Sequence, residues 1–187
     1  MRRALLIAGL MTAFALAALA SSAAANFGGT WTLDKSKSTG LSRGMQNAES
    51  VTWVITQTDK QITIESKVVA GQPPAGGAGG GGMGGGGGMG GGRGPGGGPQ
   101  AYNLDGSETT SDVNFGQATG KATSKAAWAG DALELSRKST FQTANGEVTN
   151  SLTQKLSLNG DGKVLTVNLH SEGARGTQDS TLVFNKQ

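Results

Sequence analysis

The sequence predicts an all-β fold: an antiparallel up-and-down meander of about eight to ten strands, closed as a barrel. Three observations predict it. Apolar and polar residues alternate with a period of two along most of the chain. Turn signals recur between the alternating runs. No segment after the N-terminal apolar run has a helical period over about ten residues.

The alternating runs place their large apolar residues on one face of each strand. Trp31 and Leu33 share a parity, as do Leu133 and Leu135. Valine, isoleucine and threonine, which favour half-buried strands, fill many of these positions. The remaining runs are Val51–Ile55, Ile62–Val68, Tyr102–Leu104, Ala122–Trp128, Leu152–Leu158, Leu165–Leu169 and Leu182–Phe184.

Short turns separate the runs, and several contain the Asx-Gly pairs typical of tight hairpins. Short links between successive strands make them antiparallel neighbours, hence a meander. Closure into a barrel removes the exposed edges, and a flat or sandwich arrangement is the alternative. The turns are Thr58–Lys60, Asp105-Gly106, Ala129–Asp131, Asn145-Gly146, Asn159–Gly162 and Glu172-Gly173.

The N-terminus has the pattern of a cleaved signal peptide. Met1-Arg2-Arg3 precedes the apolar run Ala4–Ala20, and small residues follow. Ala18-Leu19-Ala20 and Ala23-Ala24-Ala25 both offer an A-x-A cleavage site, and we favour the second. The alternative is a membrane anchor, since a run of about 17 residues is at the lower limit for a span. We therefore expect a secreted or periplasmic protein with a single domain at 26–187.

A glycine-rich segment interrupts the predicted barrel. Residues 71–99 hold 19 of the 33 glycines and all four prolines. Glycine has no side chain to bury and loses the most backbone entropy on folding, so we expect a disordered loop insertion. Met83 and Met89 within it could bind Cu(I) through their thioethers, or be incidental apolar residues.

Composition excludes several classes of site. The chain has 16 Lys and Arg against 13 Asp and Glu, and losing Arg2 and Arg3 with the signal peptide would lower the net charge from +3 to about +1. The sequence contains no run of Lys and Arg residues of the kind that indicates nucleic acid binding. The chain has no cysteine and only one histidine, His170, so we expect no disulfide, no metal centre and no cofactor. Oligomeric state does not follow from the sequence.

The segment Phe27-Gly28-Gly29-Thr30-Trp31-Thr32-Leu33 contains the G-x-W pattern of an opening strand and resembles the lipocalin-like, or calycin-type, barrels. The following Asp34–Ser38 is similar to small secreted bacterial proteins of this kind, most of them uncharacterised. The resemblance continues at Tyr102–Gly106, Ala127–Leu133, Leu158–Val167 and Phe184–Gln187, and so spans most of residues 27–187. It implies a barrel with the tryptophan closing one end, and a small hydrophobic or amphipathic ligand.

Five side chains are candidates for a ligand site. Arg137 shares the parity of Leu133 and Leu135, so alternation points it inward, where it could pair with a ligand carboxylate or stack on a tryptophan. A bulge would instead leave it in solvent. Trp31, Trp53 and Trp128 are either core residues or cavity walls, and Tyr102 could help orient a ligand.

No enzymatic motif is complete. Gly40–Gly44 matches G-x-S-x-G, but the nucleophile elbow needs a strand, a turn and a helix in an α/β sheet, and we expect a surface loop. His170 is expected to be a solvated residue at a strand end. We therefore predict a non-enzymatic ligand-binding protein. The alternative is a structural or interaction module of the cell envelope whose barrel core is filled by its own side chains.

Overall fold

The structure is a computed structural model that describes residues 24–71, 98–115, 118–143, 146–174 and 176–187. The predicted signal peptide at 1–25 and the glycine-rich loop at 71–99 lie almost wholly outside these residues, together with Met83 and Met89. Among the described residues, no helix is long and apolar enough to cross a membrane.

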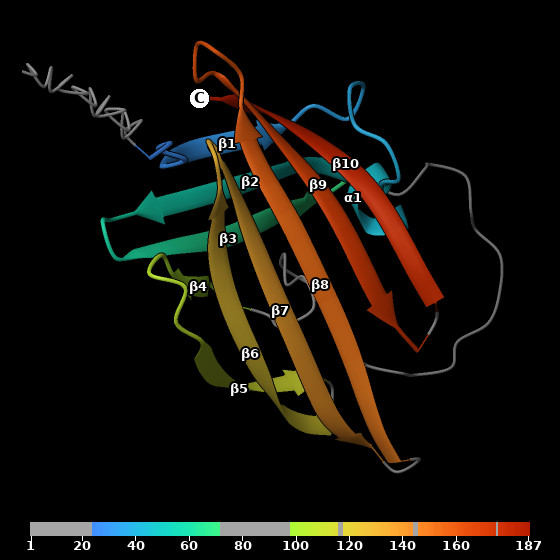
Figure 1. The fold of residues 1–187 in the computed structure, drawn as a ribbon. Coiled ribbons are helices and arrows are strands. Elements are labelled where there is room, and N and C mark those ends of the chain that lie inside the picture. The colour runs from blue at the N-terminus through green and yellow to red at the C-terminus, as the bar shows by residue number, and fades with distance from the viewer. Residues whose placement is uncertain (1–23, 72–97, 116–117, 144–145, 175) are drawn as a thin grey trace, which may run out of the picture.

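Ten strands and one short helix make up the described chain (Figure 1). The strands are β1 (Gly29–Leu33), β2 (Ala48–Gln57), β3 (Gln61–Ala70), β4 (Gln100–Asn103), β5 (Thr109–Phe115), β6 (Ala118–Ala129), β7 (Ala132–Thr143), β8 (Gly146–Leu158), β9 (Val164–Gly173) and β10 (Gly176–Lys186). The helix is α1 (Arg43–Asn47).

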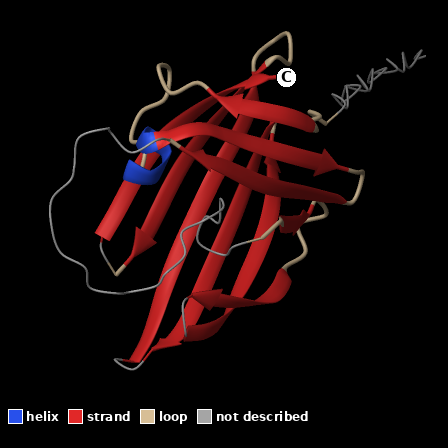
Figure 2. Ribbon diagram, turned by 180° about the vertical axis from the view of Figure 1, so that it is seen from behind, coloured by secondary structure: helices blue, strands red, loops and turns tan. Residues whose placement is uncertain are grey.

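The strands form one antiparallel sheet in the order β4-β3-β2-β1-β10-β9-β8-β7-β6-β5. All neighbours are consecutive in the chain except β1 and β10, which pair with Trp31 opposite Lys186 and Leu33 opposite Phe184. The sheet ends at β4 and β5, which are consecutive but not hydrogen-bonded to each other. The views from the front and behind show a wrapped sheet (Figures 1 and 2). The predicted all-β meander is confirmed as a nearly closed barrel of ten strands.

Two elements escaped the sequence prediction. In strand β5 Val113 is buried, and pairing of Thr109 with Ser124 through Phe115 with Ala118 holds the strand in place. Helix α1 follows Ser42, whose Oγ accepts a hydrogen bond from the backbone N–H of Met45 at 3.4 Å. The segment expected to be a surface loop therefore contains a capped helical turn, as Ser at an N-cap favours.

The main core fills one end of the barrel, because the inward parity of the strands delivers large apolar side chains there. Trp31, Leu156 and Phe184 are 0% exposed. Phe27, just before β1, is also 0% exposed and its ring stacks on Trp128 at 6.2 Å between centroids. This end is the closed end. The other buried members are Leu33, Ala48, Val51, Trp53, Ile55, Ile62, Ile64, Tyr102, Ala126, Leu133, Leu135, Leu165, Val167 and Leu182.

Candidate ligand site in the barrel interior

Beyond the main core, the inward face of the sheet becomes polar. Only Ser124, Arg137 and Gln154 are buried polar residues in the described chain. Pairing places Ser124 opposite Arg137 across β6 and β7, and Thr109 opposite Ser124 across β5 and β6. Since side chains of directly paired residues lie on the same face, Thr109, Ser124 and Arg137 form one inward-facing row.

Arg137 is the buried cation of this row. It is 8% exposed, and its Nε is buried without a hydrogen-bond partner among the described residues. The Oγ1 of Thr109 is also buried and unpartnered. No Asp or Glu is buried in the described chain. A buried cation normally has a counter-charge, so the row is chemically incomplete without an anion.

Tyr102 of β4 lies beside this guanidinium. Burial raises the pKa of the Tyr102 phenol from 10.0 to about 12, and the nearby Arg137 charge and hydrogen bond oppose that rise. The phenol oxygen donates to Oε1 of Gln100 at 2.9 Å. At neutral pH, Tyr102 is therefore an uncharged hydroxyl next to a buried positive charge.

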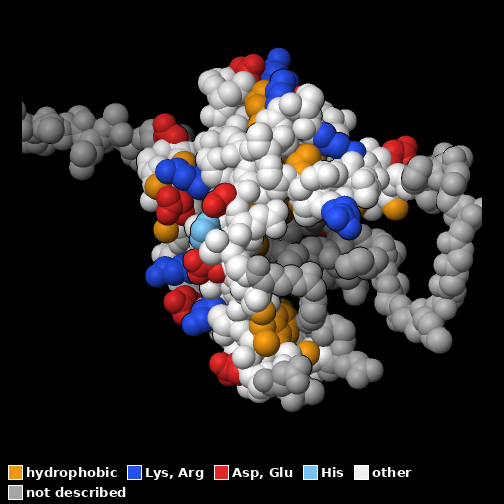
Figure 3. Space-filling model, turned by 90° about the vertical axis from the view of Figure 1, so that its right-hand side faces the viewer, with side chains coloured by type: hydrophobic (Ala, Val, Ile, Leu, Met, Phe, Trp, Pro, Cys, Tyr) orange, Lys and Arg blue, Asp and Glu red, His pale blue; other side chains and the backbone are white. Residues whose placement is uncertain are grey.

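A smaller apolar cluster lies on the other side of the polar row from the main core. It consists of Val113, Ala122 and Phe141, with Ala118 packed against them. Leu152, paired with Arg137 across β7 and β8, is half-buried. Figure 3 shows the face on the right of Figure 1, where the surface is hollowed and hydrophobic side chains gather below the hollow. The interior thus combines one cation with apolar surface on both sides.

The structure brings together two of the five predicted site residues, Arg137 and Tyr102. Arg137 is buried, as alternation predicted. Trp31 and Trp53 belong to the filled core: the indole N–H of Trp31 donates to the carbonyl of Phe27 at 2.8 Å, and Trp53 packs on Phe184 at 4.7 Å. Trp128 is half-buried at the closed end, away from the polar row.

Sequence reasoning missed Thr109 and Gln154 as interior polar residues. Gln154 has the parity of Leu152 and Leu156, so alternation alone could have placed it inside. Thr109 begins β5, where it shares the parity of Val113 and Phe115, but these are the strand's only two apolar residues. Its pairing with Ser124 places it on the inward face.

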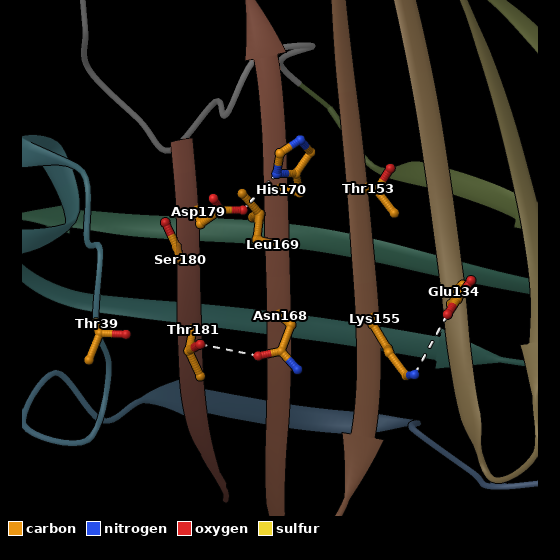
Figure 4. Close-up of a pocket in the computed structure, with 10 residues that line it drawn as sticks. All are labelled: Thr39, Glu134, Thr153, Lys155, Asn168, Leu169, His170, Asp179, Ser180 and Thr181. Atoms are coloured by element: carbon orange, nitrogen blue, oxygen red, sulfur yellow. Dashed lines mark hydrogen bonds and ion pairs between the residues drawn. The ribbon is translucent and has the colours of Figure 1, made fainter. Parts of the chain in front are cut away.

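His170 is exposed on the outer face of β9, within the strand rather than at its end. Its Nδ1 lies 2.6 Å from Asp179 of β10 and its Nε2 lies 3.4 Å from Glu172. Those hydrogen bonds, first that with Asp179, raise the pKa of the imidazole above 6.5. The shallow groove beside it, about 440 Å³, crosses the outer face of the sheet (Figure 4). The carboxylates engage different ring nitrogens, and no metal-binding cluster occurs among the described residues.

No family model and no curated protein matches the chain. Among solved structures, zebrafish ileal bile acid-binding protein complexed with cholic acid is similar, with a TM-score of 0.44 and 14% sequence identity. The alignment covers 86% of this chain and 98% of that chain. The functional argument therefore depends on this chain's own residues.

Proposed function

We propose that this protein binds one small amphipathic molecule with a single negative charge inside the barrel. The observation that carries the proposal is the buried Arg137 guanidinium, whose Nε has no hydrogen-bond partner among the described residues. Tyr102 supplies a neutral hydroxyl group beside it, and Thr109 supplies another two strands away in the same inward-facing row. The proposal assigns the chain a binding role and no catalytic step.

Charge balance selects the ligand's polar group. One buried cation without a buried carboxylate is compensated by one bound anion, and a second negative charge would again be uncompensated. Guanidinium donors match the planar oxygens of a carboxylate or the oxygens of a sulfate or phosphate ester. Because the pKa of Tyr102 is about 12, its phenol stays protonated and adds no negative charge beside Arg137.

The apolar surface near Arg137 selects the rest of the ligand. Phe141 and Val113 lie further along the strands on the side away from the main core, and Leu152 lies opposite Arg137. Each ligand methylene buried against such surface contributes about 0.8 kcal/mol. An alkyl chain or fused-ring skeleton attached to the anionic group would use both properties of the interior.

We further propose that the protein acts outside the cytoplasm, in the periplasm or as a secreted protein. The support is the order of charged, apolar and small residues over residues 1–25. An extracytoplasmic carrier needs no energy source, because burial of the apolar ligand surface drives binding.

A filled-core interaction module is the second candidate. The dense packing at the closed end favours it, since Trp31, Phe27 and Phe184 are each 0% exposed and leave little room there. The two candidate functions assign different roles to the charge of Arg137. In the filled module its charge has no ligand to neutralise it, whereas in the binding protein it is the anchor.

Native mass spectrometry of the chain, as recovered from expressing cells without detergent, tests the proposal. We expect an adduct of one small molecule that organic extraction removes, and whose fragments contain a single acidic group. After extraction, rebinding of a saturated carboxylate should restore a one-to-one adduct. A bare polypeptide mass that takes up no amphipathic anion would refute the binding function and favour the filled module.

A further inference from the structure

A second concave site lies at the closed end of the barrel, outside the main core. It is a groove of about 890 Å³ between the chain before β1, the β2–β3 turn, the turn after β4, and β6. We propose that this groove binds a neutral saccharide, which stacks on Trp128 and is hydrogen-bonded by Asp59 and Asp105. This site is separate from the interior site and does not depend on it.

The floor of the groove is aromatic. Trp128 is half-buried and one side of its ring is covered by Phe27, at 6.2 Å between centroids and an interplanar angle of 23°. The indole N–H of Trp128 has no hydrogen-bond partner among the described residues. Leu104, also half-buried, lines the groove with it. A supported indole with a free N–H offers both an apolar face and a polar edge, as a sugar ring requires.

The walls of the groove are held in place by hydrogen bonds. Oε1 of Gln57 accepts a hydrogen bond from the N–H of Phe27 at 2.8 Å, which ties the chain before β1 to the end of β2. The N–H of Leu104 donates to the carbonyl of Lys60 at 2.8 Å, which joins the β2–β3 turn to the end of β4. The segments that line the groove are thus pre-organised, which lowers the entropic cost of binding.

The carboxylates present acceptors in fixed positions. Oδ1 of Asp105 accepts hydrogen bonds from the hydroxyl and the N–H of Ser107, at 2.6 and 2.8 Å. These bonds lower the pKa of the Asp105 carboxyl, so it is ionised at neutral pH, and its Oδ2 remains available. Asp59, at the tip of the β2–β3 turn, makes no hydrogen bond or ion pair with the described residues.

The groove also contains donors. Asn26 accepts from the N–H of Gly28 through its Oδ1, at 2.8 Å, which leaves its amide hydrogens to donate. Lys60 adds an ammonium group. A hydroxyl group donates and accepts at once, so a polyol can use both sets. An organic cation would use only the carboxylates and the ring, and an anion would use only the donors. The mixture favours a neutral saccharide.

The indole N–H signal of Trp128 in a ¹⁵N-labelled sample provides the test. Three tryptophans give three such signals, and Trp128→Phe identifies the one that belongs to Trp128. The chain as recovered from cells is titrated with maltose, cellobiose and chitobiose, and separately with tetramethylammonium, to about 10 mM. We expect at least one disaccharide to shift this signal saturably, while the Trp31 signal, bonded within the core, stays in place.

Asp59→Asn removes one charged acceptor without touching a native contact and should weaken the disaccharide about tenfold. The matched control is Asp112→Asn, an exposed carboxylate on β5 outside the groove, which should bind like the parent chain. The proposal is overturned if no disaccharide moves the Trp128 signal, if only tetramethylammonium does, or if Asp59→Asn binds as well as the control.

Discussion

Replacing Arg137 by methionine should stabilise the ligand-free protein. Arg137 is 8% exposed, no carboxylate is buried in the described chain, and its Nε has no partner there. Exchange of buried ionic groups for apolar side chains of similar volume is often stabilising by about 1–4 kcal/mol. For a single cation without a buried carboxylate we expect a gain of about 1–3 kcal/mol in the free energy of unfolding. At roughly 2–4 °C per kcal/mol, the melting temperature should rise by several degrees.

The assay is urea unfolding of Arg137→Met and the parent chain, both stripped of bound molecules by organic extraction. The bond from Tyr102 to Gln100 is independent of Arg137 and should persist, so the substitution creates no new unpaired phenol. Lys138→Met, at the exposed neighbouring position on β7, is the control and should change stability by less than about 0.5 kcal/mol. A loss of stability of more than about 1 kcal/mol in Arg137→Met would show that the guanidinium is structural, and would refute the reasoning.

Three further predictions concern single residues. Tyr102 is the only tyrosine, so the absorbance change of the folded protein at alkaline pH should have one midpoint, near pH 12. Because the pKa of Tyr102 is higher in the folded than in the unfolded protein, the free energy of unfolding should fall as the pH rises above about 10. A midpoint near pH 10 would contradict the burial of this side chain. The pKa of His170, measured by NMR, should lie above 6.5 and should fall in Asp179→Asn. The contribution of His170 to stability is fully present below pH 6.5 and is lost as the pH rises through the pKa of the folded protein. An unchanged pKa in the variant would disprove the pairing of His170 with Asp179. Phe27→Ala should cost about 3–5 kcal/mol in urea unfolding, and a cost below about 1 kcal/mol would show that this ring does not seal the closed end.

The fold was largely predictable because inward parity continues through most strands. Leu133, Leu135 and Arg137 alternate without a bulge, so the same pattern that places the leucines in the core also buries the arginine. The turn at Asn159–Gly162 likewise forms where the Asx-Gly signal predicts, with Asn159 Oδ1 accepting from the N–H of Lys163 and of Val164.

The remainder depends on tertiary contacts that have no local signal. Strand β5 is polar along most of its length, and pairing with β6 holds it in the sheet. The turn between β4 and β5 also does not predict that these two strands are not hydrogen-bonded to each other. Asp105-Gly106 is the kind of pair that indicates an ordinary hairpin. The proximity of Tyr102 to Arg137 joins distant strands and follows only from closure of the barrel through β1 and β10.

The central claim is that a buried, uncompensated cation selects a monoanionic amphipathic ligand. Isothermal titration of the extracted protein with a saturated carboxylate and with the alcohol of equal chain length tests it most directly. The account predicts one-to-one binding of the carboxylate, at least about tenfold tighter than the alcohol, because only the carboxylate neutralises Arg137. Equal affinities, or no binding of either compound, would contradict it.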